Sequence, residues 1–287
     1  MADRLDSLPR VCDPGGVARV GALVEQMRRA VRDPGRLRRL HYSSVVAAVH
    51  GIVEPADAGV LARVFGVGRE EPDRLVSDLV RDGAFADAID RRHRAVRGTP
   101  LRLFADASER DADTRLRVLY GSVRLLRPRA IVETGVFDGV STSVILKALA
   151  DDGGDGRLVS IDVPALTPIP GSTDKMAATT LPAGERSGWL VPDALRERWT
   201  LHEGSAHEWL PSVLSKLGAL DAFFHDSLHT TAHMTWELDV AWPALADGGL
   251  LLTDDVFWNT AFRRFCRRRR VRGLVARGMG LVRKPSR

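Results

Sequence analysis

The hydrophobic pattern of the chain changes near residue 100. Before that point, apolar positions recur at intervals of three and four, which is typical of amphipathic helices. The stretches expected to be helical are 17–31, 45–53, 56–65 and 72–89. The charged stretch Asp87–Arg97 is expected to form a boundary. We therefore predict a helical N-terminal extension over residues 1–100, which would form a cap over a binding site.

Residues 101–287 combine short apolar runs with amphipathic helices. The runs expected to be strands are Arg129–Thr134, Arg157–Asp162, Trp199–Glu203, Ala222–Asp226 and Leu250–Asp254. The helices expected between them cover 111–126, 141–150, 208–217 and 231–245. Nearly continuous apolar strands that alternate with helices are typical of a parallel sheet covered on both faces. We predict an α/β fold, a doubly wound, Rossmann-like and mainly parallel sheet, with a closing hairpin at 271–282.

Acidic residues stand at the ends of the expected strands. They are Glu133, Asp162, Glu203, Asp226 and the pair Asp254 and Asp255. In a doubly wound sheet the ligand binds beyond the carboxyl ends of the strands. Because folding does not require acids at these positions, their shared edge is the main functional signal in the sequence.

Composition and charge narrow the class of protein. The chain has 287 residues, of which 44% are apolar and 28% charged, so it can bury a sizeable core. Its two cysteines, Cys12 and Cys266, cannot build a disulfide framework, which favours a reducing, cytoplasmic setting. No uninterrupted apolar stretch approaches the length of a membrane span, and the first residues do not resemble a signal peptide.

The net charge of +5 comes from the C-terminal tail. After Asp255 the chain has no acidic residue and 11 arginine or lysine residues. Such a tail can bind phosphate groups, although a solvated helix face is the simpler interpretation. Phe262 and Phe265 have a helical spacing that favours inward packing over base stacking, so the sequence argues against a nucleic-acid partner.

A glycine-containing loop follows the first expected strand. It contains Glu133, Gly135, Phe137, Gly139 and Ser141, and the glycines permit a tight turn and a close ligand. The following helix could hold an anionic group at its N-terminus. The loop is not the dinucleotide-binding fingerprint, because Phe137 replaces the middle glycine. An ordinary strand-to-helix turn capped by Ser141 is the alternative.

This loop resembles motif I of class I S-adenosylmethionine-dependent methyltransferases. The resemblance is closest to the family 24 (macrocin O-methyltransferase-like) and catechol O-methyltransferase-like groups, and it covers about residues 111–255. It implies that S-adenosylmethionine binds along the loop, with an acid after the second strand on the ribose hydroxyls. The residues implied in cofactor binding are Glu133, Gly135, Phe137, Gly139, Ser141, Asp162, Gly204, Ser205 and Ala206.

The resemblance also implies a divalent cation. In the metal-dependent relatives, acids after the fourth and fifth strands bind one cation, and Asp226, Asp254 and Asp255 match these positions. All-oxygen ligands suit Mg²⁺, which would orient the acceptor hydroxyl and lower its pKa. The alternative is that the three acids are solvated residues at strand ends.

His229 is expected to be the general base. It stands three residues after Asp226, where the catechol-type relatives have a lysine, and an imidazole can accept a proton at neutral pH. The alternative is that His229 packs on the following helix. His225, His229 and His233 are spaced by four but are not expected to bind zinc, because His225 falls in a strand.

The insertion 163–200 is expected to be a lid. It is long and rich in proline and glycine, and Trp189 would provide an aromatic wall. We assign it, with the N-terminal helices, to acceptor selection; a surface insertion without this role is the alternative.

The sequence therefore predicts a methyltransferase, with metal-assisted O-methylation of a small-molecule or sugar hydroxyl as the favoured reaction. Two other classes stay open. One is a hydroxylase-type relative on the same fold, since fold does not fix chemistry. The other is a cofactor-dependent protein that binds nucleic acid or a protein partner through the basic tail. A homo-oligomer is compatible with each.

Overall fold

The computed structural model describes residues 57–101, 103–104, 111–163 and 181–286, without side chains for 111–113. All of these residues belong to one compact unit, Pro55–Arg287. The helices expected at 17–31 and 45–53 lie outside the described residues. Within the described residues, no helix has the length and apolar character needed to cross a membrane.

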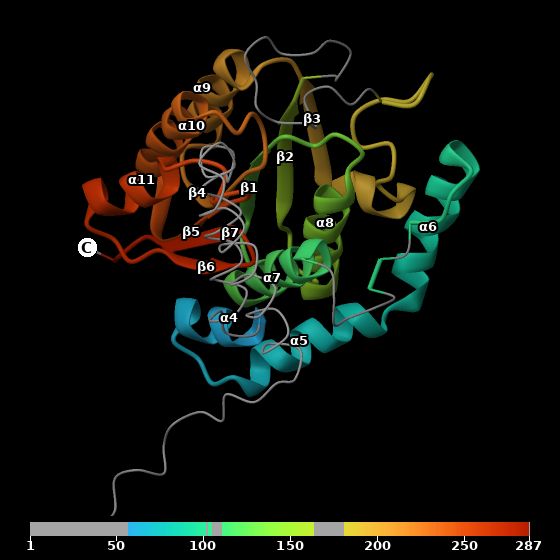
Figure 1. Cartoon of the computed structure of the whole chain (residues 1–287), viewed down its shortest axis with the longest axis horizontal. Helices are drawn as coiled ribbons and strands as arrows, with labels where there is room; N and C mark the ends of the chain where they lie inside the picture. The colour runs from blue at the N-terminus through green and yellow to red at the C-terminus, as the bar shows by residue number, and fades with distance from the viewer. Residues whose placement is uncertain (1–56, 102, 105–110, 164–180, 287) are drawn as a thin grey trace, which may run out of the picture. The chain divides into compact units, whose positions relative to one another are not determined.

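A seven-stranded sheet forms the centre of the described unit (Figure 1). Its strands are β1 (Ala130–Thr134), β2 (Arg157–Asp162), β3 (Trp199–Glu203), β4 (Leu220–His225), β5 (Leu245–Thr253), β6 (Leu274–Ala276) and β7 (Met279–Arg283). They follow the order β3-β2-β1-β4-β5-β7-β6. Strands β1 to β5 are parallel, and β7 runs antiparallel to both of its neighbours. The predicted doubly wound sheet and its closing hairpin are confirmed.

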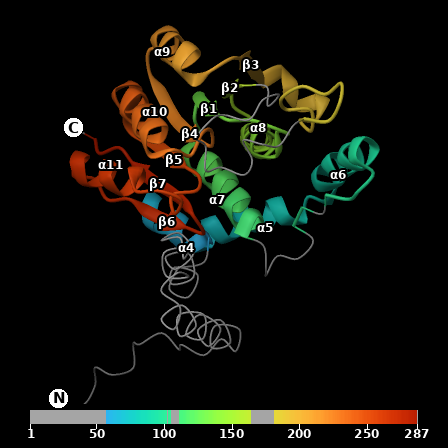
Figure 2. The same cartoon turned by 45° about the horizontal axis from the view of Figure 1, so that its top comes forward.

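Helices cover both faces of this sheet because side chains alternate along each strand. Ile131 and Phe224 point to a core shared with α7 (Asp111–Leu126) and α8 (Val140–Asp152). Val132 and Phe223, one position away, belong to the opposite core. That second core is closed by α9 (Ala206–Leu217), α10 (Thr231–Ala244) and α11 (Ala261–Arg269), which lie together in Figures 1 and 2.

The N-terminal helices extend the first of these layers. They are α4 (Asp57–Phe65), α5 (Glu70–Arg81) and α6 (Gly83–Arg97), and α4 and α5 pack against α7. The single helix expected at 72–89 is divided at Asp82, whose φ of −76° and ψ of 75° end α5. The Asp82 side chain then accepts a hydrogen bond from Phe85 N at 3.0 Å and caps α6.

The expected boundary at Asp87–Arg97 is wrong. This stretch is the second half of α6, which ends at Gly98 in a left-handed conformation with φ 70°. Only Phe85 and Ile89 of α6 are fully buried, so the charged residues after them form the outer face of an amphipathic helix.

The strand register brings the predicted acidic residues to one edge. Thr134 lies opposite His225, and His225 lies opposite Thr253. The main-chain ladder continues one residue further, because Asp226 N donates to Thr134 O and Asp254 N donates to His225 O, both at 2.8 Å. On the other side of β1, the end of β2 at Asp162 pairs with Glu203 of β3.

Candidate active site

The two loop glycines allow close approach of the chain to itself. Gly135 has φ +86°, and a Cβ there would lie 2.0 Å from the carbonyl oxygen of Asp226. Gly139 has φ +91°, and a Cβ there would lie 2.7 Å from the Cα of Gly188. The space expected for a ligand on these sides of the glycines is therefore filled by protein. Contact between the loop main chain and a cofactor stays a prediction.

Asp162 anchors the same loop from the end of β2. Its Oδ2 atom accepts hydrogen bonds from Phe137 N at 3.1 Å and from Ser187 Oγ at 2.5 Å. Burial raises the pKa of Asp162, and the hydrogen bonds from Ser187 and the main chain act against that rise. Phe137 itself has a positive φ of 50°, which directs its N–H toward the carboxylate. Asp162 is thus half-buried beside the loop, and its contact with ribose hydroxyls stays a prediction.

A second segment clamps the loop, and the sequence did not predict it. Gly188 N donates to Phe137 O at 2.8 Å, and Leu190 N donates to Asp138 O at 2.9 Å. With the Ser187 hydrogen bond to Asp162, the described end of the insertion braces the loop. The expected aromatic wall is wrong, because Trp189 is only 3% exposed and stacks on His93 at 5.9 Å between ring centroids. The preceding residues, 164–180, lie outside the described part.

Glu133, near the end of β1, stabilises the loop between β1 and α8. It is fully buried, and its carboxylate accepts hydrogen bonds from Ser141 Oγ at 3.1 Å, Thr142 Oγ1 at 2.8 Å and Ser160 Oγ at 2.7 Å. Burial raises the pKa of Glu133 to about 7, although the three hydroxyl groups oppose the rise. Ser141 does not cap α8, which begins at Val140 after Gly139. Glu133 and Ser141 therefore join β1 to α8, and direct cofactor contact by either stays a prediction.

The segment after β3 also lies beside Asp162. Gly204 N donates to Asp162 O at 2.9 Å. Ser205 caps α9 by accepting a hydrogen bond from Glu208 N at 3.2 Å, and Ala206 is buried in the first turn. Glu203 forms a surface ion pair with Arg186 at 2.8 Å. These contacts explain the local turn, and the predicted role of residues 204–206 along the adenine remains a prediction.

Three carboxylates converge at the ends of β4 and β5, together with one arginine. Arg115 of α7 donates from Nη1 to both carboxylate oxygens of Asp254 at 2.9 Å and to Asp255 Oδ1 at 3.0 Å. Asp255 has a left-handed φ of 50°, which turns its side chain toward the same nitrogen. Burial and the charges of Asp254 and Asp255 raise the pKa of Asp226, whereas Arg115 lowers it.

Among the described residues, the structure shows no divalent-cation site at these acids. Across the described residues, no group of three or more His, Cys, Asp and Glu side chains has the geometry of a metal site. The oxygens of Asp254 and Asp255 that the sequence assigns to a cation are directed at Arg115 Nη1. Metal binding by Asp226, Asp254 and Asp255 stays a prediction of the sequence.

His229 lies next to the acidic cluster, in the loop between β4 and α10. It is 5% exposed, and its Nε2 atom is 3.7 Å from Asp226 Oδ1. The loop is held in place because Asn259 Nδ2 donates to His229 O at 3.0 Å. His229 also meets the ring of His225 edge-on at 5.3 Å between centroids. The expected base is therefore fixed close to the strand ends, and its catalytic role stays a prediction.

A buried glutamate that sequence reasoning missed organises this loop. Glu237 of α10 bonds to His225 Nδ1 at 2.6 Å and His233 Nε2 at 2.7 Å, and accepts from Ser227 Oγ at 2.8 Å and Thr134 Oγ1 at 2.5 Å. The two histidines lower the pKa of Glu237 against the effect of burial. His225 and His233 thus share a carboxylate. The sequence signal that could have pointed to Glu237 was a charged residue within the apolar pattern of the expected helix 231–245.

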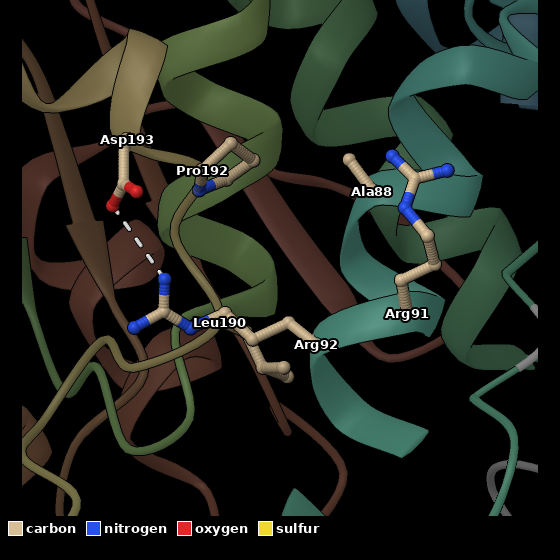
Figure 3. A pocket seen from close by; sticks show the side chains of 6 residues that line it. All are labelled: Ala88, Arg91, Arg92, Leu190, Pro192 and Asp193. Atoms are coloured by element: carbon tan, nitrogen blue, oxygen red, sulfur yellow. Dashed lines mark hydrogen bonds and ion pairs between the residues drawn. The ribbon is translucent and has the colours of Figure 1, made fainter. Parts of the chain in front are cut away.

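An open cavity of about 460 Å³ lies between α6 and the segment after Trp189 (Figure 3). It is lined by Ala88, Arg91, Arg92, Leu190, Pro192 and Asp193. Arg92 Nη1 and Asp193 Oδ1 are 3.5 Å apart across it. None of the predicted site residues lines this cavity.

The basic tail begins in α11. Phe262 and Phe265 are buried, as the sequence predicts. On the outer face, Arg268 and Arg269 pair with Asp239 of α10 at 2.7 and 3.2 Å. Part of the tail's charge is therefore balanced within the protein.

Residues 132–256, less than half of the chain, match the family model described as a methyltransferase domain. The matched segment runs from within β1 to just beyond the end of β5 and includes the predicted site residues from Glu133 to Asp255. This segment of the chain is therefore similar to methyltransferase domains. The resemblance stated from the sequence is confirmed. No curated protein matches the chain.

Two solved structures illustrate what the chain is similar to. The O-methyltransferase TomG from Streptomyces achromogenes, involved in tomaymycin synthesis and solved with SAM, is 19% identical with a TM-score of 0.47. That match covers 72% of this chain and 91% of TomG. An O-methyltransferase from Bacillus cereus, solved with SAH, is 17% identical with a TM-score of 0.46, covering 74% and 96% of the two chains.

Proposed function

We propose that this enzyme methylates a hydroxyl oxygen of a small molecule at the carboxyl edge of β1, β2, β4 and β5. One observation supports the proposal most strongly. The loop assigned to the cofactor and the loop assigned to the acceptor adjoin, because Gly135 lies against the main chain of Asp226. A methyl donor beside Asp162 and an acceptor beside His229 would then share one short stretch of sheet edge.

Asp162, the loop 135–141 and residues 204–206 would hold S-adenosylmethionine, which supplies an electrophilic methyl group. The Asp162 carboxylate would accept hydrogen bonds from vicinal ribose hydroxyls. The N-terminal turn of α8, which begins directly after Gly139, favours the negative end of a ligand. The Ser187–Leu190 brace would keep the loop in one conformation before binding, so that less ordering entropy is lost.

His229 would remove the acceptor proton. As the methyl carbon leaves the sulfonium and bonds to oxygen, the hydroxyl proton would pass to the imidazole, and neutral S-adenosylhomocysteine would be released. Asp226 Oδ1, 3.7 Å from His229 Nε2, would stabilise the imidazolium that forms. A base so close to a carboxylate suits a hydroxyl acceptor, since a hydroxyl must lose its proton during methylation.

Acceptor selection is assigned to the insertion 163–200 and the helices before residue 100. The open cavity between α6 and Leu190–Asp193 supports this assignment, since both segments contribute to its wall (Figure 3). Arg91 and Arg92 line this wall with Asp193, which is 3.5 Å from Arg92, so the wall keeps one positive charge in excess and suits an acceptor with an anionic group.

The test is release of S-adenosylhomocysteine from S-adenosylmethionine with a panel of phenol, sugar and aliphatic hydroxyl acceptors. We expect turnover with at least one hydroxyl compound, and a loss of about 10²–10⁴ in His229→Ala. His207→Ala is the matched control, because His207 is an exposed histidine in the first turn of α9, stacked on Trp236. Full activity of the His229 variant would remove the base assignment. Methylation of amines alone would remove the hydroxyl assignment.

A further inference from the structure

We infer that the guanidinium of Arg115 is the resident cation of the carboxylate cluster, in the position where the resemblance places a divalent ion. The inference deepens the proposed function and rests on it for its catalytic meaning. The structural part of the inference concerns only Arg115, Asp226, Asp254 and Asp255. It can therefore fail without the proposed function failing, and the proposed function can fail without it.

The contacts of Arg115 resemble those of a bound ion. A single nitrogen, Nη1, meets three carboxylate oxygens at 2.9, 2.9 and 3.0 Å, and these belong to two consecutive residues. Asp254 is buried, with 8% of its surface exposed. A cation that bound the same oxygens would have to displace the guanidinium from all three.

The electrostatics of the cluster favour a permanent positive charge. Asp226, Asp254 and Asp255 each raise the pKa of Arg115, so the guanidinium stays charged although burial acts against it. Three carboxylates without a cation would repel each other strongly. Because arginine does not lose its proton in proteins, this charge is present at every working pH.

The fold fixes Arg115 in this position. The residue lies in the 16-residue helix α7, whose buried residues Val118, Leu119 and Val123 anchor it against the sheet. Arg115 is separated from Asp254 by 139 positions, so the ion pair also ties α7 to the end of β5. The positive charge of Arg115 therefore belongs to the folded chain, and no ion has to bind to supply it.

Arg115 and His229 would therefore have different roles in the proposed reaction. Arg115 neutralises the carboxylates around the proposed acceptor position, and His229 accepts the proton. Arg115 is a positioning residue in this scheme, since its described contacts are to carboxylates. The reaction would therefore proceed without a divalent ion.

The test titrates Mn²⁺ into the purified full-length protein and follows free Mn²⁺ by electron paramagnetic resonance. We expect no saturable binding to wild type up to millimolar Mn²⁺. Arg115→Gln removes the charge and should create one site, with affinity at least about tenfold above wild type. Arg115→Lys keeps a positive charge and should bind no Mn²⁺. Adding Asp254→Asn to Arg115→Gln should remove the new site.

Arg124→Gln is the matched control. Arg124 also lies on α7, where it donates to Tyr120 and stands 3.9 Å from Asp151, and its loss should create no site. Saturable Mn²⁺ binding to wild type that Asp254→Asn abolishes would overturn the inference. Absence of Mn²⁺ binding to a folded Arg115→Gln variant would also overturn it. Binding of S-adenosylhomocysteine, measured on the same samples, tests the proposed function independently.

Discussion

Glu133, a residue of β1, couples the stability of the fold to pH. Its side chain is fully buried, and burial raises its pKa to about 7, from an ordinary value near 4.5. The folded protein therefore keeps a proton that the unfolded chain releases between these values. The free energy of unfolding should fall as pH rises from 4.5 to 7, by up to about 3 kcal/mol from this residue.

The variant Glu133→Gln should remove that pH dependence, because an amide keeps the shape and can still accept from hydroxyl groups. The measurement is urea unfolding at several pH values between 4.5 and 7. The control is Glu203→Gln, since Glu203 is an exposed carboxylate paired with Arg186. If the wild-type and Glu133→Gln curves ran parallel across this range, Glu133 would not carry the titration.

At the scale of elements, the β1–α8 loop is built on close contacts between main chains. Gly135→Ala would place a methyl group 2.0 Å from the carbonyl oxygen of Asp226, in addition to the strain of a positive φ. We expect a loss of about 2–4 kcal/mol in the free energy of unfolding, because the ends of β1 and β4 must separate. Chemical denaturation measures this loss directly.

Gly153→Ala is the control for strain alone. Gly153 ends α8 with φ +72°, and a Cβ there would meet no atom within 4 Å. Gly153→Ala should lower the free energy of unfolding by about 1–2 kcal/mol, because alanine is strained in the left-handed conformation. Equal losses in the two variants would show that the contact between Gly135 and Asp226 contributes nothing.

The sheet and the edge that gathers its acidic residues could be predicted because their signals are local. Apolar runs such as Ala222–Phe224 fix the strands, and the acids that follow them must meet once the strands are parallel. The glycines of the β1–α8 loop were also recognisable. Their structural cause was not, since the partners of Gly135 and Gly139 lie at Asp226 and Gly188, far along the chain.

The partners of the charged side chains required the whole molecule. The chain has 38 arginines, and no local pattern distinguishes Arg115 from the rest. Its pairing with Asp254 depends on how α7 packs across the sheet. The sequence did not identify Glu237 for the same reason, because this residue contacts His225 of β4 and Thr134 of β1 at once. Contacts between distant elements, which the sequence does not show, therefore set the partners of these charged side chains.

The edge that holds Asp162 is proposed to bind the methyl donor. Titration calorimetry with S-adenosylhomocysteine tests it most directly, on wild type, Asp162→Ala and the control Asp193→Ala, an exposed acid paired with Arg92. We predict binding to wild type and to the control. In Asp162→Ala the free energy of binding should be weaker by about 1–3 kcal/mol, because the ribose hydroxyls lose their hydrogen-bond partner. Thermal unfolding would verify that all three proteins are folded. Absence of binding to wild type, or equal affinity in all three proteins, would show that this edge does not bind the donor through Asp162.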